Sequence, residues 1–174
     1  KAMEEMLKDR SGGIIAMDFV PVLHQNEEMV HNYFDADIKK YGIKTTFNIP
    51  MDTINIKGNP EQMSMTMMSI LGNAIYAVVK KAQREQYSPE VRVSVSTSDD
   101  HYIITIRDNG IGIEDTIIDK IFDPFFTTKP TGEAAGVGLY LSREIIQNLS
   151  GDISVKSEKD VYTEFTITLP ILHN

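Results

Sequence analysis

Two runs of alternating residues, joined by a short polar turn, constrain the fold of this chain most strongly. Apolar residues occupy every second position over 91–95 and again at 102, 104 and 106, and Ser98-Asp99-Asp100 lies between the runs. A period of two places all the apolar side chains of a strand on one face. The segment therefore predicts a β-hairpin, which is the unit of an antiparallel sheet rather than of a strand-helix-strand repeat.

The other periodic segments extend this hairpin into an α+β domain. The helices predicted from apolar residues at helical spacing are 21–41, 60–83, 114–121 and 137–149. The further extended segments are 14–19, 43–49, 53–57, 152–157 and 163–169. With hairpins between consecutive strands, this order predicts a two-layer sandwich in which helices cover one face of a mixed, mostly antiparallel sheet.

The helix over 60–83 has the clearest beginning. Asn59 is a favoured N-cap, Pro60 suits the first helical position, and Gln62 lies where a capping box needs it. Gly42 marks the end of the helix before it.

The composition excludes several classes of site. The 174 residues suit one domain, and 41% of apolar residues are enough for a core. A net charge of −8, with no basic run longer than Lys80-Lys81, argues against a nucleic-acid partner. The absence of cysteine excludes disulfides, zinc–thiolate sites and a cysteine nucleophile. No apolar stretch approaches the roughly 20 residues that cross a bilayer, so we expect a cytoplasmic domain without membrane contact.

The beginning of the chain predicts a domain boundary. Apolar residues recur at helical spacing over 1–10, and Ser11-Gly12-Gly13 ends this pattern. We expect 1–13 to be the tail of a separate helical region and 14–174 to be one domain. Because the first residue is Lys1 rather than Met, we expect a fragment of a longer protein, and a membrane anchor in that protein stays open.

Four short motifs carry the chemistry, and the first lies on the helix over 60–83. Ser69 and Asn73 are four residues apart and share a helix face, and Lys80 lies further along. The amide oxygen of Asn73 can bind Mg²⁺, an ion that usually keeps several waters and takes further ligands from phosphates. The alternative is an ordinary helical asparagine bonded to a loop.

The second motif, Asp108-Asn109-Gly110-Ile111-Gly112, follows a predicted strand. A carboxylate there can accept a hydrogen bond from an exocyclic amine, and glycine lets a planar ring lie against the backbone. The alternative is a simple tight turn, for which Asn-Gly is a common signal.

The third motif is the aromatic and basic run from Ile121 to Lys129. Its three phenylalanines can hinge a loop over a ligand, and Lys129 can offer a point charge to phosphate. The alternative places the phenylalanines in the core and Lys129 on the surface.

The fourth motif, Gly136-Val137-Gly138-Leu139-Tyr140-Leu141, begins a predicted helix. Small residues bring backbone N–H groups close to an anion, and a helix N-terminus favours negative charge. The motif is not a dinucleotide fingerprint, because no parallel strand-helix-strand unit surrounds it.

Together and in this order, the four motifs resemble the nucleotide-binding boxes of the GHKL, or Bergerat-type, ATP-binding fold. The segments "GNPEQMSMTMMSILGNAIYA", "ITIRDNGIGI", "IFDPFFTTK" and "GVGLYLSREII" are similar to its sensor histidine kinase branch, and "TEFTITLP" resembles that branch's last strand. The resemblance covers roughly residues 50–170.

This resemblance implies that ATP and Mg²⁺ bind. Asn73 would hold Mg²⁺, Asp108 would take the adenine amino group, and the stretch between Phe122 and Gly136 would form a mobile lid. The residues implied to contact ATP are Asn73, Ala77, Lys80, Asp108, Gly110, Gly112, Ile113, Phe122, Thr128, Lys129, Gly136, Val137, Gly138, Leu139 and Thr163.

The chain departs from the family pattern at two positions. ATPases of the superfamily carry a glutamate four residues before the metal asparagine, and many kinases carry an asparagine, but this chain has Ser69. A serine cannot serve as a carboxylate base. Tyr162 stands where a glycine is usual, before Thr163.

No catalytic acceptor is expected in the chain itself, because none of its four histidines lies in a recognisable phosphoacceptor motif. By resemblance, the acceptor histidine belongs to a helical domain of the same protein, which is a homodimer. That histidine would attack the γ-phosphorus of ATP and pass the phosphoryl group to an aspartate of a response regulator. We therefore expect this fragment to bind ATP without autophosphorylating.

Three alternatives stay open. A GHKL ATPase module would show intrinsic ATP turnover, which Ser69 argues against. A pseudokinase would act as an interaction module, which the intact Asn73 and Asp108 argue against. A serine kinase of the anti-sigma type would need a protein serine as its substrate.

Overall fold

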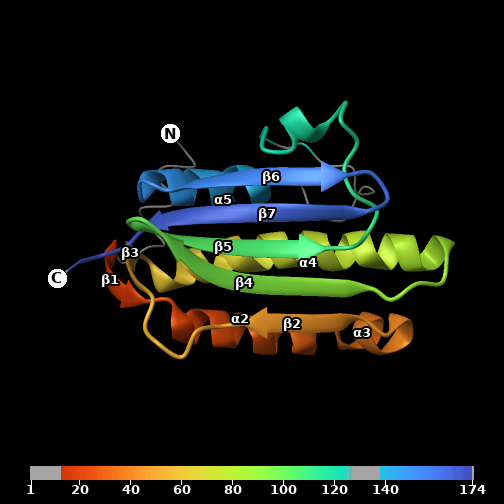
Figure 1. Ribbon diagram of the computed structural model, residues 1–174, viewed down its shortest axis with the longest axis horizontal. Helices are drawn as coiled ribbons and strands as arrows, with labels where there is room; N and C mark the ends of the chain where they lie inside the picture. Colours follow the sequence, from red (N-terminus) through yellow and green to blue (C-terminus); the bar gives the residue numbers. More distant parts are fainter. Residues whose placement is uncertain (1–12, 125, 127–137, 174) are drawn as a thin grey trace.

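A five-stranded sheet, seen face-on in Figure 1, organises the protein. The computed structural model describes residues 13–124, 126 and 138–173. Within them the strands lie in the order β2-β4-β5-β7-β6. Their bounds are β2 Lys44–Asn48, β4 Glu90–Ser98, β5 His101–Asp108, β6 Asp152–Glu158 and β7 Tyr162–Pro170. A separate pair of strands, β1 (Ile15–Asp18) and β3 (Asn55–Gly58), lies at one end.

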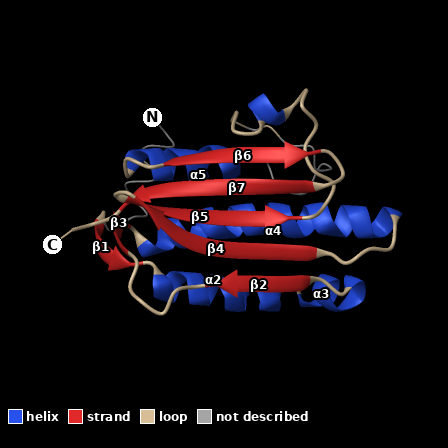
Figure 2. Ribbon diagram, in the orientation of Figure 1, coloured by secondary structure: helices blue, strands red, loops and turns tan. Residues whose placement is uncertain are grey.

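The α-helices of the described residues lie behind one face of this sheet (Figures 1 and 2). They are α2 (Val20–Tyr33), α3 (Asp35–Tyr41), α4 (Pro60–Arg84) and α5 (Gly138–Asn148). Among the described strands, β2 and β4 pair in parallel and the other pairings are antiparallel. The predicted two-layer sandwich with a mixed, mostly antiparallel sheet is therefore confirmed.

Alternating strand residues and the apolar stripe of α4 form the core between the two layers. Ile104 and Ile106 on β5 are buried, as are Met67 and Ile70 on α4. At its N-terminus, α4 is capped as predicted, because the Asn59 side chain accepts a hydrogen bond of 3.0 Å from the Gln62 N–H. None of the described helices has the length and apolar character needed to cross a membrane.

The expected hairpin between β2 and β3 does not form. β2 pairs with β4, and β3 pairs with β1. The Asp18 carboxylate explains part of this difference, because it accepts hydrogen bonds from the N–H groups of Val20 (3.0 Å) and Ile54 (2.9 Å). These bonds hold the residue before β3 next to the end of β1. Because the two segments are far apart in the sequence, no local pattern predicts this contact.

Two predicted helices are also different from expectation. The helix over 21–41 breaks at Phe34, whose φ of −110° and ψ of 20° are not helical while its side chain packs against the core. The chain nevertheless ends this region at Gly42 in a left-handed conformation, as predicted. Instead of a helix over 114–121, there is a single 3₁₀ turn, Ile118–Lys120. The predicted helical tail over 1–10 and the predicted helix start at Val137 lie outside the described residues.

Replacing Asn59 tests the N-cap of α4. We expect Asn59→Ala to lower the free energy of unfolding by about 1 kcal/mol, because the Gln62 N–H loses its acceptor at a buried helix end. Asn59→Asp retains an acceptor and should lose much less stability. Urea denaturation of both variants checks this, and equal stability of Asn59→Ala and Asn59→Asp would contradict it.

Candidate functional site

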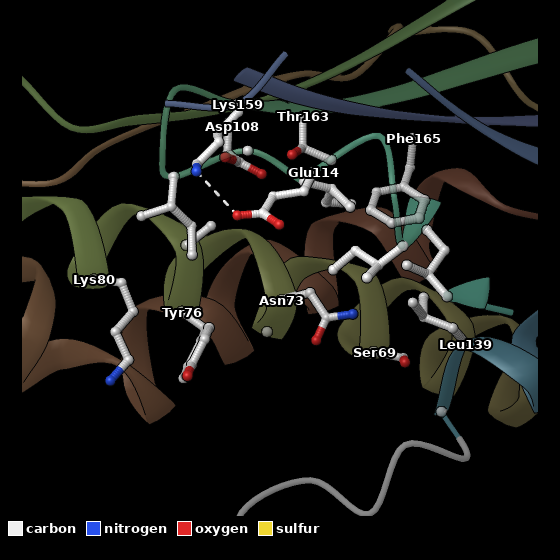
Figure 3. A pocket seen from close by; sticks show the side chains of 18 of the residues that line it. Ser69, Asn73, Tyr76, Lys80, Asp108, Glu114, Leu139, Lys159, Thr163 and Phe165 are labelled. Atoms are coloured by element: carbon white, nitrogen blue, oxygen red, sulfur yellow. Dashed lines mark ion pairs between the residues drawn. The ribbon is translucent and has the colours of Figure 1, made fainter. Parts of the chain in front are cut away.

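A cavity of about 1090 Å³ opens between α4, the loop that follows β5, and the first turn of α5. β7 and the turn between β6 and β7 complete its walls (Figure 3). Its size is at the upper end of small-molecule sites, which are roughly 300–1,000 Å³. The predicted site residues that line it are Asn73, Ala77, Lys80, Asp108, Gly112, Ile113, Gly138, Leu139 and Thr163.

The remaining predicted site residues do not line the cavity or cannot be placed. Gly110 lies directly against α4, and Phe122 packs behind the cavity wall. Thr128, Lys129, Gly136 and Val137 lie outside the described residues, as does most of the predicted lid.

One face of α4 forms a polar wall of the cavity. Ser69, Asn73, Tyr76 and Lys80 follow one another at intervals of four, three and four residues, the spacing of one helix face (Figure 3). The Lys80 ammonium lies 5.3 Å from the centroid of the Tyr76 ring, within the range of a cation–π contact. Tyr76 was not predicted, although its spacing from Ser69 and Asn73 could have identified it.

The Asp108 carboxyl lies at the bottom of the cavity and is only 3% exposed. Its Oδ1 accepts a hydrogen bond of 2.9 Å from the Gly110 N–H. Burial raises the pKa of Asp108 to about 7 from an ordinary value of 3.8, although the Gly110 hydrogen bond and the Arg107 charge both act to lower it. A ligand N–H group that reaches this carboxyl would favour its charged form.

A second acceptor lies beside Asp108. Strand pairing places Thr163 of β7 opposite Asp108 of β5, and both are buried. The Ser157 hydroxyl donates to the Tyr162 carbonyl (2.7 Å), so it is the Thr163 hydroxyl that donates across the 2.9 Å contact with Ser157. The Thr163 hydroxyl oxygen can then accept a hydrogen bond from a ligand. Together with the Asp108 carboxyl it forms a pair of acceptors, which suits a ligand amine.

Both glycines of the second motif allow close packing of the loop, in addition to the ligand approach expected for them. A Cβ on Gly110 would overlap the backbone of Ala77, and the Ile111 N–H donates to the Ala77 carbonyl at 3.2 Å. Gly112 has a φ of +68°, and a Cβ there would overlap the Glu158 carbonyl. The loop is thus wedged between α4 and the turn between β6 and β7.

Asn109 has a structural role that sequence reasoning missed. Its side-chain oxygen accepts from the Glu90 N–H (2.7 Å), and its amide donates to the Ser88 carbonyl (2.8 Å). These bonds tie the loop before β4 to the end of β5. An asparagine in an Asn-Gly pair is expected to bond within its own turn, so the sequence gives no signal for these distant partners.

The first turn of α5 closes the cavity opposite Lys80. Gly138 and Leu139 line the cavity, and a Cβ on Gly138 would lie 2.5 Å from the Ser69 hydroxyl oxygen. The close approach of the two helices therefore needs a small residue on both. The N-terminus of a helix of this length carries partial positive charge that suits an anion.

Phe122 of the third motif packs against the core, as the alternative considered for this motif expects. The Phe122 ring meets the Phe165 ring edge-on, with the two centroids 6.2 Å apart. The Arg143 guanidinium lies 4.6 Å from the centroid of the Phe122 ring. Phe126 and Phe165 reach the cavity instead. The cavity also has an ion pair at its mouth, in which Lys159 contacts Glu114 at 2.9 Å (Figure 3).

The described residues contain no group of three histidine or carboxylate side chains that could hold a metal by themselves. The site therefore combines a buried amine acceptor, a polar helix wall with one amide, and a helix N-terminus. In a two-layer α+β fold, such a cavity suits a ligand of the nucleotide type, which has an amine at one end and phosphates at the other.

Comparisons with known proteins agree with this class. Residues 58–173 match the family "Histidine kinase-, DNA gyrase B-, and HSP90-like ATPase". The chain is 38% identical over 117 residues to the signal transduction histidine-protein kinase AtoS of Escherichia coli, which covers 67% of this chain and 18% of that protein. It is 31% identical over 149 residues to the sensor histidine kinase ZraS of Salmonella typhimurium, covering 84% of this chain and 30% of that protein.

Solved structures share the fold at low sequence identity. A mycobacterial sensor histidine kinase, MprB, superposes with a TM-score of 0.73 at 20% identity, covering 91% of this chain and 98% of that one. The catalytic domain of the histidine kinase ThkA gives a TM-score of 0.72 at 20% identity, covering 91% and 96%.

The chain therefore belongs to the histidine kinase-, DNA gyrase B- and HSP90-like ATPase family, and it is an ATP-binding catalytic domain of the sensor histidine kinase type. It spans less than a third of the length of the two curated relatives named above.

Replacing Gly110 tests the contact between the loop and α4. We expect Gly110→Ala to lower the free energy of unfolding by about 1–3 kcal/mol, because its methyl group would overlap the Ala77 backbone. Gly72→Ala is a matched control: Gly72 lies inside α4 with no atom closer than 3.9 Å to the added Cβ. It should raise the free energy of unfolding by about 0.5–1 kcal/mol. Urea denaturation of both proteins checks the pair, and a Gly110→Ala protein as stable as wild type would contradict it.

The raised pKa of Asp108 makes stability depend on pH. Between pH 5 and 7 this carboxyl is ionised in the unfolded chain and protonated in the folded one, so stability falls as pH rises. We expect wild type to lose roughly 2–3 kcal/mol over this window relative to Asp108→Asn, which has no proton to lose there. Denaturation curves of both proteins at matched pH values measure this difference, and parallel pH profiles would contradict the assignment.

Proposed function

We propose that this domain binds ATP with Mg²⁺ and positions the γ-phosphoryl group for transfer to a histidine of a separate helical domain in the same protein. The phosphoryl group then passes to an aspartate of a response regulator. The observation that carries the proposal is the paired acceptor, Asp108 with Thr163, at the bottom of a cavity whose other end is the α5 N-terminus. This arrangement suits a molecule with an amine at one end and phosphates at the other.

The residues present fit a nucleotide-borne magnesium ion. Asn73 lies on the cavity wall between the acceptor pair and the α5 N-terminus, and its amide oxygen is a ligand type that Mg²⁺ accepts. Asn73 would hold the ion together with phosphate oxygens and water. When bound, the ion would neutralise part of the negative charge of the phosphates.

Each part of the chain then has a role in positioning. Asp108 and Thr163 orient the base, and Gly112 and Ile113 line its approach. Gly138 and Leu139 present the α5 N-terminus to the phosphates, and Lys80 offers a mobile charge to them. Positioning and electrostatics carry most of the rate in phosphoryl transfer, so a site without a covalent catalyst is sufficient.

Two features favour transfer to a separate acceptor over hydrolysis. Four residues before Asn73, the cavity carries Ser69, which cannot deprotonate water as a carboxylate could. None of the chain's histidines, all of which are described, lines the cavity. We therefore place the acceptor histidine on the absent helical domain, with the parent protein a homodimer whose catalytic domain faces the cytoplasm.

Calorimetric titration with a non-hydrolysable ATP analogue and Mg²⁺ tests nucleotide binding. We expect wild type to bind, and Asp108→Ala to bind roughly 10-fold to 150-fold more weakly, since a hydrogen bond to a charged group contributes about 1.5–3 kcal/mol. Arg92→Ala, which removes an exposed ion pair with Glu90 on β4, is the control and should bind like wild type. A folded wild type that does not bind would overturn the proposal in favour of an interaction module.

Two further measurements address transfer itself. Asn73→Ala should bind the analogue equally with and without Mg²⁺, whereas wild type should bind more tightly with the ion. Adding the helical domain of the parent protein should yield phosphohistidine, whereas this domain alone should yield none. Rapid hydrolysis of ATP by this domain alone would instead favour an ATPase module.

A further inference from the structure

Asp160 uses its three polar groups to join three parts of the structure. Its N–H donates to the Ile111 carbonyl at 2.6 Å, its carbonyl accepts from the Lys81 ammonium at 2.6 Å, and its carboxylate pairs with Arg84 at 2.7 Å. It lies in the turn between β6 and β7 and lines the cavity. Its φ of +64° is in the left-handed region, which residues with a Cβ seldom adopt.

These contacts close a ring that begins and ends on α4. Ala77 contacts the loop at Gly110 and Ile111, the loop contacts Asp160, and Asp160 returns to α4 through Lys81 and Arg84. The three α4 residues are four and three positions apart, so they share one face of the helix. No flexible element separates them, because all three lie within the same α-helix.

The end of β6 holds the loop at two more points. The Ile113 N–H donates to the Ser157 hydroxyl at 2.7 Å, and Gly112 packs against the Glu158 backbone. The segment from Gly110 to Ile113 is therefore fixed from both sides, directly after the carboxyl that faces the ligand.

We propose that Asp160, with Lys81 and Arg84, is a clamp that sets the position of the base-binding loop and thereby the selectivity for adenine over bases without an exocyclic amine. The inference rests on the proposed function, since it assigns a positioning role within that site. In this role Asp160 acts on the position of the loop and not on the base itself. It acts through Ile111, whose carbonyl accepts from the Asp160 N–H and which directly follows Gly110, the donor of the hydrogen bond to Asp108.

The clamp acts on ligand position more than on global stability. The Arg84 and Asp160 side chains are 52% and 48% exposed, and exposed ion pairs contribute little to folding. In addition, a glycine at the left-handed position removes the unfavourable contact of the Cβ. Asp160→Gly should therefore leave stability unchanged or higher while releasing the turn from Arg84.

The experiment compares the dissociation constants of ATP and inosine triphosphate analogues, each with Mg²⁺, for wild type, Asp160→Gly and Arg84→Ala. Inosine carries a carbonyl in place of the adenine amine, so the ratio of the two constants reports recognition by Asp108. We expect wild type to favour ATP at least tenfold. In both variants we expect ATP binding to weaken about threefold to tenfold and the selectivity ratio to fall by a similar factor.

Arg92→Ala is the matched control, because it removes an ion pair whose arginine is as exposed as Arg84, 51% against 52%, and Arg92 does not line the cavity. Thermal denaturation of every variant separates loss of selectivity from loss of folding. Wild-type ATP affinity and selectivity in Asp160→Gly would overturn the clamp while leaving the proposed function intact. Failure of wild type to bind ATP would overturn both.

Discussion

The contact between the backbone of Gly110 and that of Ala77 is the constraint on which the rest of the site depends. In the core, side chains such as Met67 and Ile104 separate the sheet and helix layers. At Gly110 the two main chains meet without a side chain between them. The end of β5 is thereby drawn onto α4, and the Asp108 carboxyl becomes buried although the strand itself ends there.

The helix α4 connects folding to ligand binding, because one of its faces packs into the core and another lines the cavity. Its apolar face, which includes Ile70 and Ile75, packs into the core. The face with Asn73 and Tyr76 lines the cavity, and the residues near its C-terminal end hold the turn that follows β6. A rigid helix fixes the distances among these groups more accurately than separate loops could.

Local patterns predicted most of the elements and the four motifs, but not the helix break, the 3₁₀ turn or the distant contacts. Alternation predicted β4 and β5, and the N-cap at Asn59 predicted where α4 begins. The break at Phe34 and the pairing of β3 with β1 depend on side chains that pack far along the chain. At the site, the same limit applies: the sequence indicated Asp108 and Asn73, whereas Asp160 became apparent only through its contacts with three separate elements.

Both ends of the described chain are held by the same short stretch around β3. The Asn59 amide donates to the Gly13 carbonyl at 3.4 Å, and the Leu172 N–H donates to the Asn55 carbonyl at 2.8 Å. Four residues of extended chain span only about 13 Å, and the cavity lies toward the opposite end of the sheet. A short linker could therefore join the two ends, so the domain suits circular permutation, with new ends opened at the turn between β4 and β5.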